Sequence, residues 1–401
     1  MNDHTSPWRT NRNRAPDLPL TLEDSMRNPP RGKNTGGTNR RRFLTMTAGM
    51  TASLPLVSVR ESAAFEDLRG GRASDDSLVI KAQGSFMVGG TVLTAANGDT
   101  FHGDHAYVHY QIPPDARSLP IVMWHGGGQF SKTWESTPDG REGYQSIFLR
   151  RGFSSYIFDQ PRRGRAGRGL EGTTITNAVP NESGIWGIFR LGRWPVFFPN
   201  VQFSGAYDPD ALDQFYRQQT PDTGPSFDLA HRHILISAAA ALFDKIGPAI
   251  LITHSASGRL GWPTAIASAN VKAIICYETG SFVFPEGEVP PPPPPHEAIP
   301  VSLTDFLKLT RIPIQVVFGD NIPTAPTTPA NLDQWRTAFV QARLFVDAVN
   351  RHGGDAQLLH LPEIGILGNT HFSFSDLNNR DVADQLSRFL SENDLDKRDP
   401  S

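Results

Sequence analysis

The sequence predicts an α/β protein in which helices cover both faces of a mostly parallel sheet. Short, continuous apolar runs such as 121–124 and 249–253 are typical of strands that are buried on both faces. Segments with helical spacing of apolar residues alternate with these runs, which favours parallel strands joined by helices. Residues 106–112 instead alternate apolar and polar side chains, which indicates a half-buried strand at an antiparallel N-terminal edge.

The individual elements follow in chain order from the same periodicities. A hairpin is expected over 85–93, with Gly89 and Gly90 as its turn. The expected strands are 106–112, 121–124, 155–158, 249–253, 271–277, 314–318 and 357–361, and the expected helices are 144–151, 230–245, 259–269 and 381–390. A further long helix carries one apolar stripe, made of Leu332, Trp335, Phe339, Ala342, Val346 and Val349.

Two segments interrupt this alternation. Residues 165–229 are rich in aromatic residues, Gly and Pro, and such an insertion between sheet elements predicts a cap over the carboxyl edge of the sheet. A surface lobe without that role is the alternative. Residues 286–300 contain the run Pro290 to Pro295, which predicts a stiff polyproline spacer. A docking site for a proline-recognising domain is the alternative there.

The composition limits the classes to which the protein can belong. The 401-residue chain is 38% hydrophobic, which is enough for a sizeable core. Its 38 Lys and Arg residues against 41 Asp and Glu residues give a net charge of −3, which excludes a globally basic nucleic-acid-binding protein. The single cysteine excludes an intrachain disulfide and a cysteine-based zinc site. No cofactor and no metal are expected, and the sequence leaves a homodimer open.

The N-terminal segment differs in charge from the rest of the chain. Residues 1–42 carry nine Lys and Arg residues against four Asp and Glu residues. Residues 1–39 are polar and show no hydrophobic periodicity, which predicts a disordered leader. The sequence Arg40-Arg41-Arg42-Phe43-Leu44 then precedes a mildly apolar stretch over 45–59. This arrangement resembles a twin-arginine export signal, with cleavage expected near 62–64.

This signal sets the expected domain organisation and location. The apolar part, 43–59, is short and interrupted by polar residues and Pro, so no stable membrane insertion is expected. We expect a leader and signal peptide over 1–64 and a globular domain over 75–401. The expected partner is the twin-arginine export machinery, and the expected location is periplasmic or secreted. A basic tail followed by a short amphipathic segment is the alternative.

A candidate nucleophile follows the apolar run 249–253. Ser255 lies in the sequence Thr253-His254-Ser255-Ala256-Ser257-Gly258, which predicts a nucleophile elbow with Thr253 and Ser257 in place of the usual glycines. Such a turn strains the serine and exposes its hydroxyl where the next helix directs its N-terminal amides. Ser257 is a rival because Gly258 follows it, but it lies four residues past the strand rather than two. Helix capping by Ser255 is the structural alternative.

A candidate oxyanion hole follows the strand that ends at Trp124. The sequence His125-Gly126-Gly127-Gly128 would let backbone N–H groups approach a substrate oxygen. We expect the donors to be the amides of Gly127 and Ala256. A glycine-rich turn with no such role is the alternative, and His125 is expected to be structural.

The candidate base is His371, because it lies in a loop after the last expected strand. His352 at a helix end and His360 in a strand are less suitable. His254 is next to the candidate nucleophile, but its side chain is expected to point elsewhere.

Two carboxylates compete for the role of the acid. Glu278 follows one expected strand, 23 residues after Ser255, and Asp320 follows the next. Spacing does not decide between them.

At these residues the chain resembles the α/β-hydrolases of the bacterial esterase 713 type, over roughly residues 80–395. The matching stretches are Val88-Gly89-Gly90, Tyr110-Gln111-Ile112-Pro113, His125-Gly126, Thr133 to Arg141, Phe158-Asp159-Gln160, His254 to Gly258, Glu278-Thr279-Gly280, Val316 to Asp320 and Gly368 to His371. The resemblance implies an α/β-hydrolase fold with an inserted cap. It also implies a serine carboxylic-ester hydrolase that acts on a small-molecule ester through an acyl-enzyme.

The same resemblance assigns the site residues. It implies that Ser255 is the nucleophile, His371 the base and Glu278 the acid, in preference to Asp320. The chain departs from the type protein at Gly127 and Gly128, where that protein has adjacent cysteines in a vicinal disulfide, so a more flexible loop is expected here. The type protein has Gln at the position of Ala256, which keeps the amide but lacks that side chain.

Other functions remain as alternatives. Amide or lactone hydrolysis could occur on the same fold, because a fold does not fix a substrate. A catalytically inactive secreted binding protein is disfavoured, since no member of the triad is missing. The arginines of 162–168 lack a phosphate-binding glycine pattern and are expected to form a solvated loop near the cap, with contact to an anionic substrate as the alternative.

Overall fold

The computed structural model describes residues 77–171, 182–225, 228–291 and 297–398. The chain divides into two units, Met1–Val59 and Arg60–Ser401, and every described residue belongs to the second. The expected leader and export signal over 1–64 lie outside the described residues. Within the described ranges, no helix combines the length and the apolar character that crossing a membrane requires.

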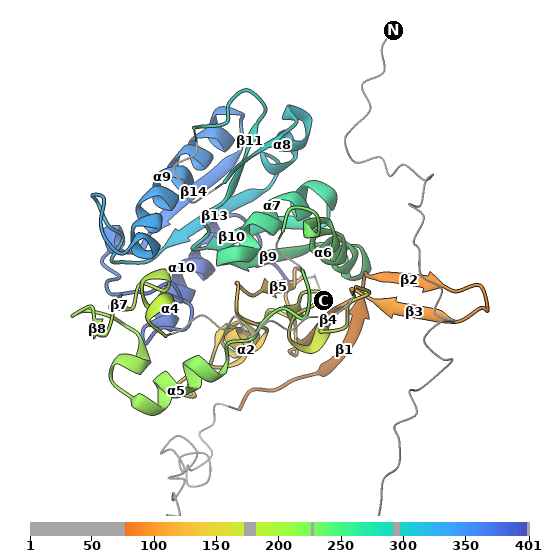
Figure 1. The fold of residues 1–401 in the computed structure, drawn as a ribbon, viewed down its shortest axis with the longest axis horizontal. Coiled ribbons are helices and arrows are strands. Elements are labelled where there is room, and N and C mark those ends of the chain that lie inside the picture. Colours follow the sequence, from red (N-terminus) through yellow and green to blue (C-terminus); the bar gives the residue numbers. More distant parts are fainter. Residues whose placement is uncertain (1–76, 172–181, 226–227, 292–296, 399–401) are drawn as a thin grey trace, which may run out of the picture. The chain divides into compact units, whose positions relative to one another are not determined.

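The described residues form an α/β fold around one eight-stranded sheet (Figure 1). Its strands, in spatial order, are β1 (Ala82–Val88), β4 (Ala106–Ile112), β6 (Ser155–Asp159), β5 (Ile121–Trp124), β9 (Ala249–His254), β10 (Val271–Tyr277), β13 (Pro313–Phe318) and β14 (Asp355–His360). Strand β4 is antiparallel to β1 and to β6, and all pairs from β6 to β14 are parallel. The mostly parallel sheet with an antiparallel N-terminal edge is therefore confirmed.

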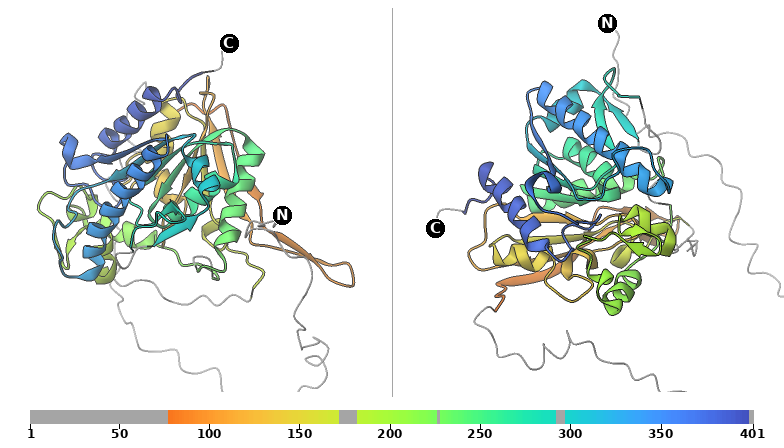
Figure 2. Two further views of the ribbon diagram at one scale, coloured as in Figure 1. Left: turned by 90° about the horizontal axis from the view of Figure 1, so that it is seen from above. Right: turned by 90° about the vertical axis from the view of Figure 1, so that its left-hand side faces the viewer.

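Helices cover both faces of this sheet (Figure 2). One face carries α6 (Arg232–Ile246), α7 (Gly258–Ala267), α8 (Leu303–Leu309) and α9 (Ala330–Arg351), and the other carries α3 (Tyr144–Arg150) and α10 (Asn379–Glu392). Strand side chains alternate between the two cores: on β5, Val122 and Trp124 join the α6–α9 core, while Ile121 and Met123 join the α3–α10 core. This alternation on an all-apolar strand explains why both faces need a helix layer.

The order of the strands creates a topological switch point at the carboxyl edge of the sheet. The chain passes from β5 to β6 on one side and then crosses back to β9 on the other side of β5. The loops that leave the carboxyl ends of β5 and β9 therefore run in opposite directions. In open α/β sheets ligands bind at such a switch point, because the diverging loops leave a crevice there.

The glycine pair near the N-terminus forms a turn, but the hairpin predicted over 85–93 is wrong. Strand β1 pairs with β4, whereas β2 (Thr91–Thr94) pairs with β3 (Thr100–Gly103). Gly89 and Gly90 have φ of +67° and +81°, and a Cβ on Gly89 would lie 2.7 Å from the backbone of Ala238 in α6. The turn directs the chain away from the sheet edge, so the β2–β3 hairpin projects from the body (Figures 1 and 2).

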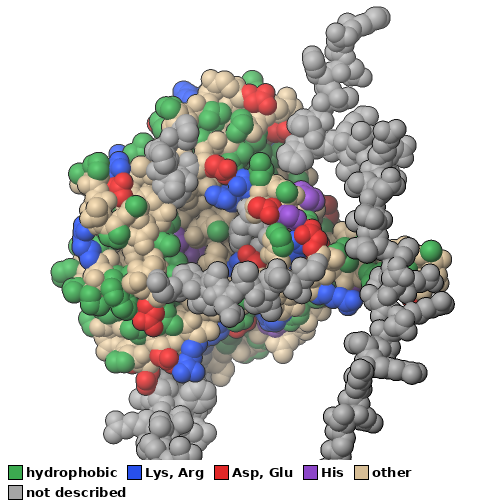
Figure 3. Space-filling model, viewed as in Figure 1, with side chains coloured by type: hydrophobic (Ala, Val, Ile, Leu, Met, Phe, Trp, Pro, Cys, Tyr) green, Lys and Arg blue, Asp and Glu red, His purple; other side chains and the backbone are tan. Residues whose placement is uncertain are grey.

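The aromatic insertion contributes to the core of the domain. Its described elements are η1 (Gly164–Ala166), α4 (Glu182–Ile188), β7 (Gly192–Arg193), β8 (Val196–Phe197), η2 (Ser204–Ala206) and α5 (Pro209–Arg217). Trp186, Phe203 and Phe215 are buried in the α3–α10 core. Figure 3 shows apolar side chains on the surface over β7 and β8, where Trp194 and Val196 are exposed.

Several short elements carry no clear periodicity and were not predicted. Around the proline-rich segment, β11 (Phe282–Pro285) pairs in parallel with β12 (Ala298–Val301), and α8 follows directly. Helix α2 (Lys132–Glu135) and the 3₁₀ turns η3 (Ser255–Ser257) and η4 (Leu361–Ile364) complete the described elements.

Candidate active site

Ser255 is the first residue after β9 and begins the 3₁₀ turn that leads to α7. Its φ is +53°, a left-handed conformation that a residue with a side chain adopts rarely and at a cost. The strand ends at His254, and the turn Ser255–Ser257 connects it to the helix. Ser255 and Ala256 are partly exposed, whereas their neighbours His254 and Ser257 are buried. The strained strand–turn–helix that the sequence predicts is present.

Ser257 holds this turn in place. Its hydroxyl accepts a hydrogen bond from the His254 amide at 2.9 Å and lies 3.0 Å from the carbonyl oxygens of Trp124 and His254. The side chain is fully buried, so the rival nucleophile is a structural bridge between β5 and β9. Gly258 allows the close approach of α7 to β10 and to the segment after it, because a Cβ there would lie 2.8 Å from Sγ of Cys276 and 2.4 Å from the side chain of Thr279.

The glycine loop after β5 lies against this turn. A Cβ on Gly126 would lie 2.7 Å from Nδ1 of His254 and 3.1 Å from Cβ of Ser255, so only glycine fits. A Cβ on Gly127 would lie 3.5 Å from Cβ of Ala256, an ordinary contact. The structure therefore brings Gly127 and Ala256, the residues whose amides are the predicted donors, next to each other.

The side chain of His125 contacts the backbone of the glycine loop. The side chain is fully buried, its Nδ1 lies 2.9 Å from the carbonyl oxygen of Gly126, and the amide of Gln160 donates to Nε2 at 3.4 Å. Burial, and then the charge of Arg163, lowers the pKa of His125 to about 4, so the ring is neutral. A neutral ring with its proton on Nδ1 satisfies both contacts.

His371 lies in the loop between β14 and α10, and its side chain is fully buried. Its ring centroid lies 4.5 Å from that of Trp335, 5.6 Å from that of Phe189 and 4.6 Å from that of His254. The Nε2 atom of His254 lies 2.9 Å from the backbone oxygen of His371. The residue that precedes Ser255 therefore contacts His371 directly, although we expected its side chain to point elsewhere.

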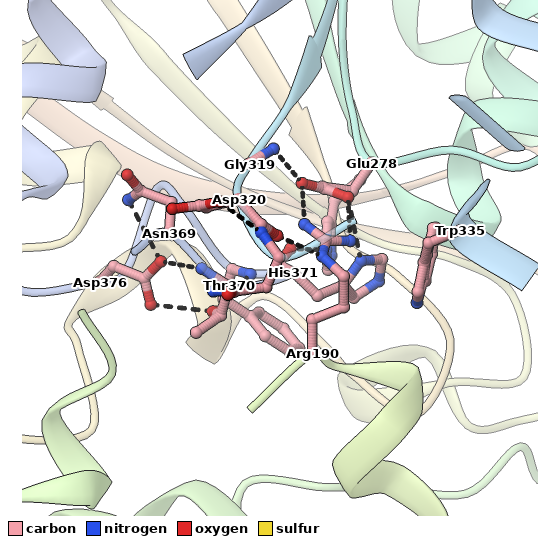
Figure 4. A network of polar contacts seen from close by, with 12 residues as sticks. Arg190, Glu278, Gly319, Asp320, Trp335, Asn369, Thr370, His371 and Asp376 are labelled. Carbon is pink, nitrogen blue, oxygen red and sulfur yellow. Dashed lines mark hydrogen bonds and ion pairs between the residues drawn. The ribbon is translucent and has the colours of Figure 1, made fainter. Parts of the chain in front are cut away.

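Glu278 follows β10 and faces His371 (Figure 4). Its Oε2 lies 3.7 Å from Nδ1 of His371, and both side chains are fully buried. This distance exceeds a hydrogen bond, but such contacts often shorten when substrate binds. Arg190 donates to both carboxylate oxygens at 2.6 Å, and the amide of Gly319 donates to Oε1 at 2.5 Å. Burial raises the pKa of Glu278, but Arg190 and His371 outweigh it and lower the pKa to about 2.

Asp320, the other candidate acid, is engaged elsewhere. Its Oδ2 accepts hydrogen bonds from the amide of Gly368 at 2.7 Å and from Nδ2 of Asn200 at 3.0 Å. Its Oδ1 accepts from the amide of Asn321. The carboxylate thus anchors the loop that leads to His371, while Glu278 faces the imidazole.

Two residues that sequence reasoning missed, Arg190 and Asp376, hold Glu278 and the loop that carries His371. Arg190, from the insertion, binds Glu278 as described above. Asp376 accepts hydrogen bonds from the amide of Thr370 at 2.7 Å, from its hydroxyl at 2.9 Å and from Nδ2 of Asn369 at 3.2 Å. No local pattern signals either residue, because each acts on groups that are distant in sequence or across a loop.

The prediction that the arginines of 162–168, after β6, form a solvated loop is wrong for part of the loop. Arg162 and Arg163 are 1% and 3% exposed and pair with Asp104 and Asp222, so this part of the loop is buried rather than solvated. Arg165 donates to the buried carboxylate of Asp159, which also accepts from the amide of Ser131 at 2.7 Å.

The other histidines named from the sequence lie apart from this group. His352 pairs with Glu288 and His360 with Glu363. In the described part of the chain, no three His, Cys, Asp or Glu side chains gather in a way that could hold a metal ion.

Comparisons with known proteins bear on the fold and on the class of reaction. No family model matches the chain. A probable secreted lipase, phiG, from a fungal species (strain ATCC 74256) is 27% identical over 331 residues, which cover 73% of this chain and 87% of the lipase. A solved structure of a bacterial esterase is 31% identical, with a TM-score of 0.65 over 81% of this chain and 99% of the esterase. The chain therefore belongs to the family of this bacterial esterase, a family of carboxylic ester hydrolases with the α/β-hydrolase fold.

Proposed function

We propose that the protein hydrolyses carboxylic esters through a triad of Ser255, His371 and Glu278 and an acyl-enzyme intermediate. One observation carries the proposal: the buried Glu278 carboxylate faces Nδ1 of His371 at 3.7 Å, at the sheet edge where Ser255 is held at φ +53°. A carboxylate on one ring nitrogen orients the imidazole and leaves the other nitrogen free to accept a proton.

In the first half of the reaction, Oγ of Ser255 attacks the carbonyl carbon of the ester, and His371 Nε2 takes the hydroxyl proton. The carbonyl oxygen becomes an oxyanion and accepts hydrogen bonds from the amides of Gly127 and Ala256. The C–O bond to the alcohol then breaks, and His371 gives its proton to the leaving oxygen. The acyl group remains on Ser255.

In the second half, water replaces the alcohol. His371 takes a proton from the water as its oxygen attacks the acyl carbon, and the same two amides hold the second oxyanion. The bond to Ser255 Oγ breaks, Ser255 recovers its proton from His371, and the acid leaves. Glu278 stays ionised throughout, because its pKa is about 2.

The test compares two neighbouring serines. We expect Ser255→Ala to lower the turnover of p-nitrophenyl acetate by at least about 10³-fold while the melting temperature stays near that of the wild type. Ser257→Ala is the matched control, since it removes a buried hydrogen-bonding hydroxyl: it should lower stability by about 1–3 kcal/mol but keep a functional nucleophile. Full activity of a folded Ser255→Ala variant would end the proposal.

The substrate class needs a panel of compounds. Rates on p-nitrophenyl esters of graded chain length, on a lactone and on an anilide separate ester hydrolysis from lactone and amide hydrolysis. We expect esters to react fastest and a serine-bound acyl group to be detected by mass spectrometry during turnover. Faster hydrolysis of the anilide or lactone would reassign the substrate.

We also propose that the protein is exported through the twin-arginine pathway. The Arg40–Leu44 sequence supports the pathway, and the probable secreted fungal relative supports export in general. Replacing Arg41 and Arg42 together by Lys should retain the protein in the cytoplasm of a bacterial host, as fractionation would show. Unchanged export of that variant would argue against the pathway.

A further inference from the structure

Arg190 is a fully buried arginine whose every nitrogen has a partner. It lies between α4 and β7 in the insertion, with φ of +51°. Nη1 and Nη2 bind the two oxygens of Glu278 at 2.6 Å each, and Nε donates to the backbone oxygen of Asp320 at 2.8 Å. The guanidinium also lies 5.2 Å from the ring centroid of Trp335. This fork, drawn in Figure 4, holds the carboxylate in one plane.

The same stretch of the insertion holds the base. Phe189, the neighbour of Arg190, stacks on the His371 ring at 5.6 Å with an angle of 9° between the planes. The backbone oxygen of Phe189 accepts a hydrogen bond from the amide of His371 at 3.0 Å. Trp335 packs on the ring and on the guanidinium together. Two consecutive residues therefore bind the acid and the base.

We propose that Arg190 is a positioning residue that fixes the Glu278 carboxylate against His371 and offsets its charge, so that His371 stays a neutral base into the acidic range. The proposal rests on the proposed triad. It also gives the insertion a part in assembling the site, because the acid is held by a residue from outside the sheet.

The charges beside His371 control its protonation, because its side chain is buried away from water. A buried carboxylate alone would stabilise a protonated imidazole beside it, whereas a carboxylate paired with a guanidinium carries little net charge. Burial lowers the pKa of His371, Glu278 raises it, and the charge of Arg190 lowers it again. Of the other titratable groups near the ring, His254 is neutral because burial holds its pKa far below the usual range. Asp376, on the loop of His371 itself, faces Asn369 and Thr370.

The experiment measures the pH dependence of kcat/KM on p-nitrophenyl acetate for Arg190→Met, Arg190→Lys and the control Arg193→Met, an exposed arginine in the same segment. We expect Arg190→Met to raise the midpoint of the acidic limb by about one pH unit or more and to lower the plateau at least about tenfold. Arg190→Lys keeps the charge but not the fork, so its midpoint should stay and its plateau should fall. Arg193→Met should match the wild type in both.

Measurements on variants that lack the Glu278 carboxylate separate the electrostatic role of Arg190 from a purely structural role. In Glu278→Gln the charge of Arg190 acts on His371 without an opposing carboxylate, so this variant should lower the midpoint below the wild-type value, and the added Arg190→Met should raise it again. A midpoint that the added Arg190→Met leaves unchanged would overturn the mechanism, as would a folded Arg190→Met whose midpoint matches the wild type.

Folding is checked by thermal melting. If Arg190→Met does not fold, Arg190→Lys and the neutral double variant carry the test, since removing both charges avoids an unpaired buried ion. A wild-type plateau and midpoint in Arg190→Lys would overturn the positioning role. None of these results alters the triad itself, which stands or falls with Ser255→Ala.

Discussion

Ser255 and Glu278 follow directly after two residues that are paired on neighbouring parallel strands. His254 on β9 is in register with Tyr277 on β10, and the next residue on each strand has a left-handed backbone, with φ of +53° for Ser255 and +57° for Glu278. Each such conformation costs roughly 1–3 kcal/mol, so the surrounding contacts must enforce it. Ser255 and Glu278 thus follow neighbouring strands side by side at the carboxyl edge of the sheet.

This placement predicts which carboxylate matters to catalysis. We expect Glu278→Gln to lower kcat by roughly 10²–10⁴-fold, because His371 loses its charged partner. Asp320→Asn should change kcat by less than about tenfold, since it only weakens the anchor to Gly368. Glu278→Gln should also lose about 3–5 kcal/mol of stability through the unpaired Arg190, so kinetics must be compared below its melting temperature. A larger kcat loss in Asp320→Asn would reverse the assignment.

The burial of His371 predicts where activity is lost at acidic pH. Burial holds the pKa of His371 below 6.5, although Glu278 opposes this. The base works only when neutral, so activity is present above the pKa and lost as the pH falls through it. A plot of kcat/KM against pH should therefore show an acidic limb with its midpoint below pH 6.5. Glu278 adds no limb above about pH 2, and a midpoint at or above 7 would contradict the geometry.

The glycine loop predicts that alanine substitutions at Gly126 and Gly127 differ in their effect on stability. A methyl group on Gly126 would meet the His254 ring and Ser255, and His254 is fixed by His371, so Gly126→Ala should cost about 1–3 kcal/mol. Displacing the loop should also lower kcat by roughly 10²-fold. Gly127→Ala meets only an ordinary contact and keeps its N–H, so its stability should change by less than about 1 kcal/mol. Urea unfolding and steady-state kinetics measure both effects, and equal losses in the two variants would refute the packing argument.

Asp376 predicts a link between loop order and activity. Asp376→Ala leaves the amide and hydroxyl of Thr370 without an acceptor, so stability should fall by about 2–3 kcal/mol and kcat by about tenfold as the His371 loop loosens. The exposed Asp381 in the first turn of α10 is the matched control, and its Ala variant should lose less than about 1 kcal/mol. Thermal melts with rates measured on the same samples provide the comparison, and a wild-type kcat in Asp376→Ala would count against the link.

Much of the fold follows from local patterns. The predicted strands 121–124 and 271–277 match β5 and β10 residue for residue, since strands buried on both faces are mostly apolar, with Lys272 of β10 as the one charged residue in the two strands. The stripe from Leu332 to Val349 places α9 because helical spacing is a local property. Pairing is not local: β2 and β3 join each other because Gly89 and Gly90 turn the chain against α6.

The sequence by itself determined the alternation of strands and helices, the strained turn at Ser255 and the glycine loop before it, because each depends on neighbouring residues. Only the tertiary structure decided that Glu278 rather than Asp320 faces His371, that Arg162 and Arg163 are buried, and that Arg190 reaches the carboxylate from the insertion. Those outcomes depend on which charged groups share a space without water. A buried charge needs an opposite charge or a hydrogen-bonding group beside it, and that partner can come from a residue far away in the sequence.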